Sequence, residues 1–210
     1  MRTALEHRQA FCKTLIHVRE SFGRIRTNSG TSKSLRFPDL HKLTEGLFLS
    51  GWTYWEGFCR DVLIYDLATD GRGKLRSEIS NFRTKNAPIR LAARMLNHPD
   101  HPEKCVDWSD YKTVRDRANE FLAAGHRFTV LARSADVANL KRIRNAVAHR
   151  SDKAWEGFRS LVTSAPFSLG GRQLRGITPG RFLSSHQWNG TWVLDEALNV
   201  LEASAVQLVT

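Results

Sequence analysis

Residues 39–69 decide the fold class of this chain, and they read DLHKLTEGLFLSGWTYWEGFCRDVLIYDLAT. Apolar side chains recur there at steps of three or four residues, the spacing that places them on one buried face of an α-helix. Asp39 directly follows Pro38 and can cap the start of this helix, and the GRG at 71–73 predicts its end. The apolar stripe consists of Leu43, Leu47, Phe48, Trp52, Trp55, Cys59, Val62, Leu63 and Leu67.

A second long helical stretch is predicted over residues 134–162, with a break near Ser151 after which helical character resumes. Ser134 or Asp136 can cap its start. Its buried face would consist of Val137, Leu140, Ile143 and Val147. Another helix is expected over residues 3–22, and shorter helices over 72–82, 86–97 and 110–124.

The composition changes after Pro166, where SLGGRQLRGITPGRFLSSHQWNGTW contains five glycines and the turn signals GG and NG. We predict loop with one or two short hairpins there, followed by a final helix over about 193–207. The fold class is therefore all-α: a helical bundle built on two long antiparallel helices. Residues 1–162 would form the helical domain, and residues 163–210 a Gly-rich extension and C-terminal helix that pack on it.

The charge of the chain is unevenly distributed. Its 210 residues include 32 Lys and Arg against 21 Asp and Glu, a net charge of +11. Residues 151–210 contain five basic and five acidic side chains, so the whole excess lies in residues 1–150. A strongly basic domain favours polyanionic partners, RNA or DNA before membranes, although charge can also serve solubility alone.

Other classes of protein are disfavoured by what the sequence lacks. No apolar run approaches the roughly 20 residues that span a bilayer, and the N-terminal region has no apolar core typical of a secretory signal. The three cysteines, Cys12, Cys59 and Cys105, are widely spaced and odd in number, unlike a disulfide framework. We therefore expect a cytoplasmic protein without a membrane partner.

The candidate site is the run KRIRNAVAHR at residues 141–150. Histidine has the side chain best suited to proton transfer near neutral pH, and the planar guanidinium of arginine matches a phosphate group. The run contains Arg144, Asn145 and His149 but no carboxylate, a combination suited to RNA cleavage without a metal ion. Further positive charge for binding RNA comes from Lys141, Arg142 and Arg150.

Helix geometry limits how these residues can cooperate. Five residues along a helix rotate by about 140° and rise about 7.5 Å, so Arg144 and His149 do not share a face of a straight helix, whereas Asn145 and His149 do. One site can include both only if the helix end opens or if two chains pool their residues in the groove of a symmetric dimer. The alternative is a solvated helix face with a surface histidine.

The run IRNAVAH, preceded by a long helix containing WTYWEGF, resembles the HEPN superfamily over roughly residues 5–162. The resemblance implies an all-α, metal-independent endoribonuclease that needs no cofactor and acts as a homodimer, as in prokaryotic toxin and antiphage systems. It implies that Arg144 stabilises the scissile phosphate, that Asn145 orients the site, and that His149 is the general acid or base at the 2′-hydroxyl. The implied product is a 2′,3′-cyclic phosphate, and the implied partners are RNA, a second copy and an antitoxin or other inhibitor.

Glu56 lies on or beside the apolar stripe of the 39–69 helix, where a carboxylate is costly unless it is paired. Arg144 is the first candidate partner, so Glu56 would either position the catalytic residues or form a purely structural ion pair. His98, His101 and Cys105 have a spacing that could bind a metal ion, but two prolines interrupt them and we interpret the segment as a loop.

Two other functions remain open on the sequence. HEPN-like domains also serve as non-catalytic modules for dimerisation or for binding a nucleotide or partner. A basic DNA-binding protein is a weaker alternative, because the basic residues scatter over several elements and no helix-turn-helix signature is present.

Overall fold

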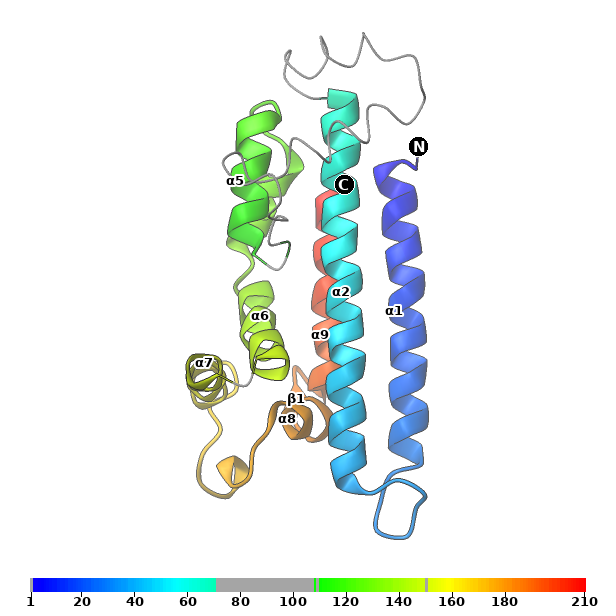
Figure 1. Cartoon of the computed structure of the whole chain (residues 1–210), viewed down its shortest axis with the longest axis vertical. Coiled ribbons are helices and arrows are strands. Elements are labelled where there is room, and N and C mark those ends of the chain that lie inside the picture. Colours follow the sequence, from blue (N-terminus) through cyan, green and yellow to red (C-terminus); the bar gives the residue numbers. More distant parts are fainter. Residues whose placement is uncertain (1, 71–107, 109, 150) are drawn as a thin grey trace. The chain divides into compact units, whose positions relative to one another are not determined.

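The computed structural model describes residues 2–70, 108, 110–149 and 151–210 (Figure 1). These residues form an all-α helical bundle with one small antiparallel hairpin, as the sequence predicts. In the described part of the chain, no helix is long and apolar enough to cross a membrane. The elements are α1 (Ala4–Thr27), α2 (Phe37–Asp70), α5 (Tyr111–Phe121), η1 (Arg127–Arg133), α6 (Ala135–Ala148), α7 (Asp152–Thr163), η2 (Gly171–Leu174), α8 (Pro179–Ser185), β1 (Gln187–Trp188), β2 (Thr191–Trp192) and α9 (Val193–Val209).

The chain divides into two compact units that do not follow the order of the sequence. The first contains Met1–Phe11, Trp55–Ser134 and Ser204–Thr210, and the second contains Cys12–Tyr54 and Ala135–Ala203. The division into residues 1–162 and 163–210 stays a prediction. Residues 141–149 of the candidate run belong to the second unit.

The first unit has an aromatic core at one end of α1. The rings of Phe11 and Phe58 stack with centroids 5.1 Å apart, and Trp55 packs against both. A largely buried carboxylate, Asp66, pairs with Arg127 at 3.0 Å. The expected helix over 110–124 is α5, whereas the helices expected over 72–82 and 86–97 lie outside the described residues.

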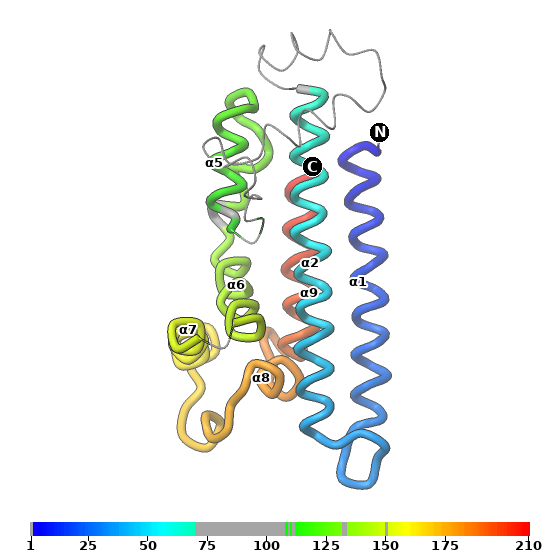
Figure 2. The backbone as a smooth tube through the Cα atoms, in the orientation of Figure 1, coloured from blue at the N-terminus to red at the C-terminus, as the bar shows by residue number. Residues whose placement is uncertain are grey.

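The second unit begins with a helical hairpin made from α1 and the first half of α2 (Figure 2). The first helix continues to Thr27, beyond the predicted end at residue 22, so the loop between the helices is shorter than expected. At Gly51 of α2, an added Cβ would lie 3.0 Å from Leu198 of α9 and 3.9 Å from Leu15 of α1. The missing side chain therefore lets the three helices pack closely.

The stretch predicted over 134–162 forms two helices, because the expected break near Ser151 separates α6 from α7. The side chain of Ser151 accepts a hydrogen bond from the backbone N–H of Ala154 at 3.3 Å and so caps the start of α7. The two helices contact each other and lie at a steep angle (Figure 1). The two longest helices in the described part of the chain are therefore α2, with 34 residues, and α1, with 24, rather than α2 and one helix over 134–162.

The glycine-rich segment contains a hairpin and a short helix. Asn189 and Gly190 both have positive φ, 52° and 82°, as the NG signal of a tight hairpin predicts. Trp192 of this hairpin stacks beneath the guanidinium of Arg26 at 3.2 Å. The final helix, α9, confirms the prediction over 193–207. Sequence analysis missed α8, although Thr178 caps it and Pro179 opens it, a standard start signal.

Gly180 holds α8 against α2. Its backbone N–H donates to Oε1 of Glu45 at 3.1 Å, and an added Cβ would meet the carbonyl group of His41 and, at 2.9 Å, the same Glu45 oxygen. Burial lowers the pKa of the neighbouring His41, and the positive charge of Arg181 lowers it further, while Glu45 opposes both effects. The contact therefore tolerates no side chain at position 180.

We predict that Gly180→Ala lowers the free energy of unfolding by about 1–3 kcal/mol, because backbone atoms must move to admit the methyl group. Gly23→Ala is the control, since an added Cβ there meets nothing within 4 Å. It should raise stability by about 0.5–1 kcal/mol, because alanine favours the helix. Urea unfolding followed by circular dichroism measures both, and equal stabilities of the two variants would contradict this packing.

Candidate active site at the end of α6

Helix α6 carries the candidate site at its C-terminal end. Val137, Leu140 and Ile143 are buried and anchor the helix, whereas Arg144 and Asn145 are half-buried. The helix ends at Ala148, and the backbone N–H of His149 still donates to the carbonyl of Asn145 at 2.8 Å. His149 therefore lies at the first position beyond the helix, held by the last helical hydrogen bond.

The end of the helix brings Arg144 and His149 into contact within one chain. Nη1 of Arg144 lies 3.1 Å from Nε2 of His149 and donates to Oδ1 of Asn145 at 3.3 Å. Arginine has only donors, so Nε2 of His149 must accept in this hydrogen bond and its proton must lie on Nδ1. Because this contact forms where α6 ends, Arg144 and His149 of one chain can serve one site.

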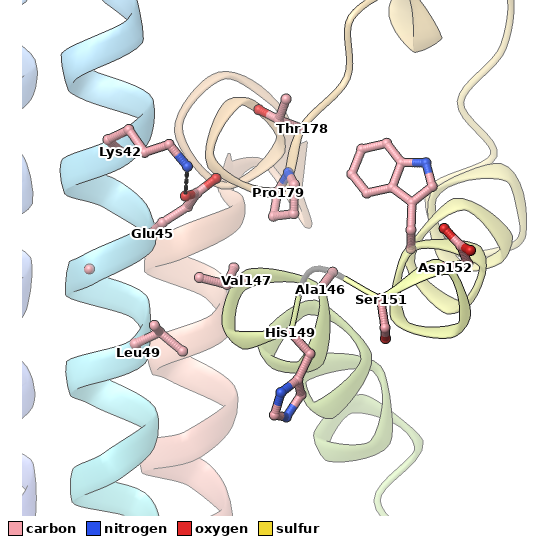
Figure 3. A pocket seen from close by; sticks show the side chains of 12 residues that line it. Lys42, Glu45, Leu49, Ala146, Val147, His149, Ser151, Asp152, Thr178 and Pro179 are labelled. Atoms are coloured by element: carbon pink, nitrogen blue, oxygen red, sulfur yellow. Dashed lines mark hydrogen bonds and ion pairs between the residues drawn. The ribbon is translucent and has the colours of Figure 1, made fainter.

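Two hollows meet at His149. The first is a cavity of about 520 Å³ walled by α2, α6, α7 and the start of α8 (Figure 3). The second has a volume of about 260 Å³, and His149 and Ser151 line both. The first is lined by Lys42, Glu45, Gly46, Leu49, Ala146, Val147, His149, Ser151, Asp152, Trp155, Thr178 and Pro179. The second is lined by Arg142, Asn145, His149, Ser151, Lys153, Ala154 and Gly157.

The first turns of α7 give the two hollows different chemistry. Asp152 and Trp155, three residues apart, line the cavity, whereas Lys153 and Gly157, four apart, line the second hollow. The second hollow thus has two cationic side chains, Arg142 and Lys153, and no carboxylate among its lining residues. It matches the charge of a phosphodiester backbone.

The other predicted site residues are placed as follows. Arg142 is exposed and lines the second hollow, while Lys141 is half-buried and is not among the residues that line either hollow. Arg150 lies outside the described residues. Glu56 is half-buried in the part of α2 that belongs to the first unit, and its pairing with Arg144 stays a prediction.

The aromatic stripe of α2 serves the core rather than the site. Trp52 and Trp55 are 2% and 3% exposed, which confirms their interpretation as core residues. The described residues contain no group of three or more His, Cys, Asp or Glu that could hold a metal ion. His98, His101 and Cys105 lie outside them.

Sequence reasoning missed the residues of the cavity wall. Trp155 lies in the stretch predicted to resume helical character after Ser151, with no role in the site, yet it is 38% exposed and lines the cavity. Its spacing from Asp152, with Ser151 as the cap, was a usable signal that both lie on one face of a helix start. Lys42, Glu45 and Thr178 had no such signal, because they are distant from the motif in sequence.

Comparison of the chain with protein-family models, with curated proteins and with solved structures finds no match. The HEPN resemblance therefore stays a prediction that depends on the residues of the motif.

The cap at Ser151 fixes where α7 begins and thus where the chain turns after His149. We predict that Ser151→Ala lowers the free energy of unfolding by about 1 kcal/mol, because the N–H of Ala154 loses its acceptor. Ser151→Asp retains an acceptor and should stay within a few tenths of a kcal/mol of wild type. Ser160→Ala, at an exposed position of the same helix, is the control, and urea unfolding measures all three variants. If Ser160→Ala lowers the free energy of unfolding as much as Ser151→Ala does, the capping role of Ser151 is refuted.

Proposed function

We propose that this chain is a metal-independent endoribonuclease of HEPN type, acting as a homodimer in the cytoplasm. The contact between Arg144 and His149 at the open end of α6 carries the proposal. The guanidinium of Arg144 keeps its positive charge, and Nε2 of His149 accepts its hydrogen bond. The second hollow, lined by two cationic side chains, lies beside this pair. A phosphate-binding group next to a proton acceptor is what 2′-hydroxyl attack requires.

The reaction is a transesterification within the RNA strand. Nε2 of His149 takes the proton of a 2′-hydroxyl, and the 2′ oxygen attacks the adjacent phosphorus. The bond from phosphorus to the 5′ oxygen breaks, and that oxygen leaves with a proton supplied by the site or by water. The products are a 2′,3′-cyclic phosphate and a 5′-hydroxyl.

Arg144 has two roles in this reaction. Before RNA binds, its Nη1 donates to Nε2 of His149 and therefore occupies the lone pair that a base needs. A bound phosphate offers charged acceptors, which attract the guanidinium more strongly than a neutral imidazole does. Arg144 then stabilises the phosphate and frees the histidine, while Asn145 keeps the guanidinium in place through its Oδ1.

We predict that Arg144→Ala and His149→Ala each reduce the rate of RNA cleavage about 100-fold or more, since each removes a group needed in the transition state. His17→Ala is a matched control, because this exposed histidine on α1 pairs only locally with Glu20. Cleavage of a fluorescent RNA in EDTA measures the rate, and mass spectrometry identifies the cyclic phosphate. Light scattering measures the molar mass of each variant and so shows whether it forms the dimer.

The catalytic proposal fails if the wild-type protein cleaves no RNA in EDTA, or if His149→Ala cleaves as fast as the His17→Ala control. The proposed role as a toxin or antiphage effector, held in check by an antitoxin or other inhibitor, adds a cellular test. Expression in a bacterial host should be toxic, and His149→Ala should relieve the toxicity.

A substitution of Arg142, which lines the second hollow, tests whether this hollow binds the phosphates of RNA. Arg142→Ala should weaken RNA binding to a similar extent for all sequences, because phosphate contacts do not read bases. The slope of log K against log salt should fall in magnitude by about 0.7 for each lost contact to a single strand. Fluorescence anisotropy with His149→Ala as the background measures this. An unchanged slope would exclude a phosphate contact by Arg142.

The cavity beside His149 favours a second candidate, a non-catalytic HEPN-like module that binds a nucleotide or a partner and dimerises. Its volume of about 520 Å³ lies in the range of small-molecule sites. Nucleotide binding without any RNA cleavage by the wild-type protein would support this candidate over the ribonuclease.

A further inference from the structure

The cavity and the second hollow share His149 but suit different parts of a nucleotide. The second hollow has only cationic charge, from Arg142 and Lys153. The cavity combines the carboxylates of Glu45 and Asp152 with one lysine and with apolar walls. Its balance of charge disfavours a phosphate and favours an uncharged group with N–H donors, such as a nucleobase.

The carboxylates of the cavity are not equivalent. Both oxygens of Glu45 are engaged, one by the N–H of Gly180 at 3.1 Å and one by Nζ of Lys42 at 2.6 Å. Asp152 is exposed in the first turn of α7, and no hydrogen bond or ion pair among the described residues involves its carboxylate. Asp152 lines the cavity, and both oxygens of its carboxylate can accept hydrogen bonds from a ligand.

Guanine matches these groups best among the four bases. Its N1–H and N2–H₂ are adjacent donors that pair with the two oxygens of one carboxylate, and its O6 can accept from the lysine. Uracil has a single N–H that lies between two carbonyl oxygens, and a carboxylate repels those oxygens. Adenine and cytosine have a ring-nitrogen acceptor beside their amino group, so they cannot donate to both oxygens of one carboxylate. The exposed indole of Trp155 supplies a face on which an unstacked base can stack.

We propose that the cavity binds the base of the ribonucleotide that supplies the attacking 2′-hydroxyl, and that it selects guanine through Asp152, with Trp155 as the stacking surface. This inference rests on the proposed ribonuclease activity. It places the base on the Asp152–Trp155 face of α7, the 2′-hydroxyl at His149, and the following phosphate toward Arg144 and the basic hollow.

The test uses four DNA oligonucleotides of one sequence, each with a single ribonucleotide at the same position: G, A, C or U. Cleavage by 2′-hydroxyl attack can occur only after that ribonucleotide. We expect kcat/KM to be at least tenfold higher for the G substrate than for each of the others. In Asp152→Asn the preference should fall below threefold, because the amide places a donor against the donors of guanine.

Filling the cavity gives a second test with a matched control. A Cβ added at Gly46 or at Gly23 meets nothing within 4 Å, but only Gly46 lines the cavity. Gly46→Leu should lower kcat/KM for the G substrate at least tenfold, whereas Gly23→Leu should match wild type. Trp155→Ala, which enlarges the cavity instead, should raise KM for the G substrate, and urea unfolding verifies that each variant is folded.

The outcomes separate this inference from the proposed function. If the wild type cleaves all four oligonucleotides within threefold of one another, or prefers another base, the guanine site is refuted while the ribonuclease stands. A guanine preference that survives in both Asp152→Asn and Gly46→Leu also refutes the site. If no oligonucleotide and no cellular RNA is cleaved, the ribonuclease fails, and the assignment of the cavity to the attacking nucleotide fails with it.

Discussion

The end of α6 at Ala148 is the constraint on which the site depends. Within a straight helix, Arg144 and His149 would lie about 140° apart and could not meet. The helix stops at Ala148, and beyond its end Nε2 of His149 lies 3.1 Å from Nη1 of Arg144. Ser151 then starts α7 with its own cap, so the short break has helical hydrogen bonding on both sides. The site is thus formed by a helix boundary rather than by a helix face.

The same break also shapes the surroundings of the site. After it, α7 leaves at a steep angle (Figure 1). Its Asp152 and Trp155 line the cavity, whereas its Lys153 lines the second hollow. α8 is held to α2 at Gly180 and supplies Thr178 and Pro179 to the cavity wall. The two hollows that share His149 could therefore accept a neutral base and a charged backbone, as proposed above. The close packing at Gly180 thus fixes part of the wall of the cavity to which we assign base selectivity.

Much of the fold could be predicted because its signals are local. The apolar stripe along residues 43–67 predicts α2, and the NG pair at 189–190 predicts the hairpin, since each depends on backbone preferences of adjacent residues. The break near Ser151 was likewise visible. The extension of α1 to Thr27 was not, because Gly23 lowers the helical preference at the predicted end, and the contact of Arg26 with Trp192 joins residues far apart in sequence.

The identity of the motif was a property of the sequence alone: Arg144, Asn145 and His149 in a basic run without carboxylates, within an all-α chain whose charge excess lies in residues 1–150. Whether Arg144 and His149 could meet in one chain was decided by tertiary structure, because the point at which a helix ends depends on the packing and capping of its neighbours. The cavity was decided the same way. Its walls come from segments near residues 45, 150 and 178, and only folding brings side chains so distant in sequence around one space.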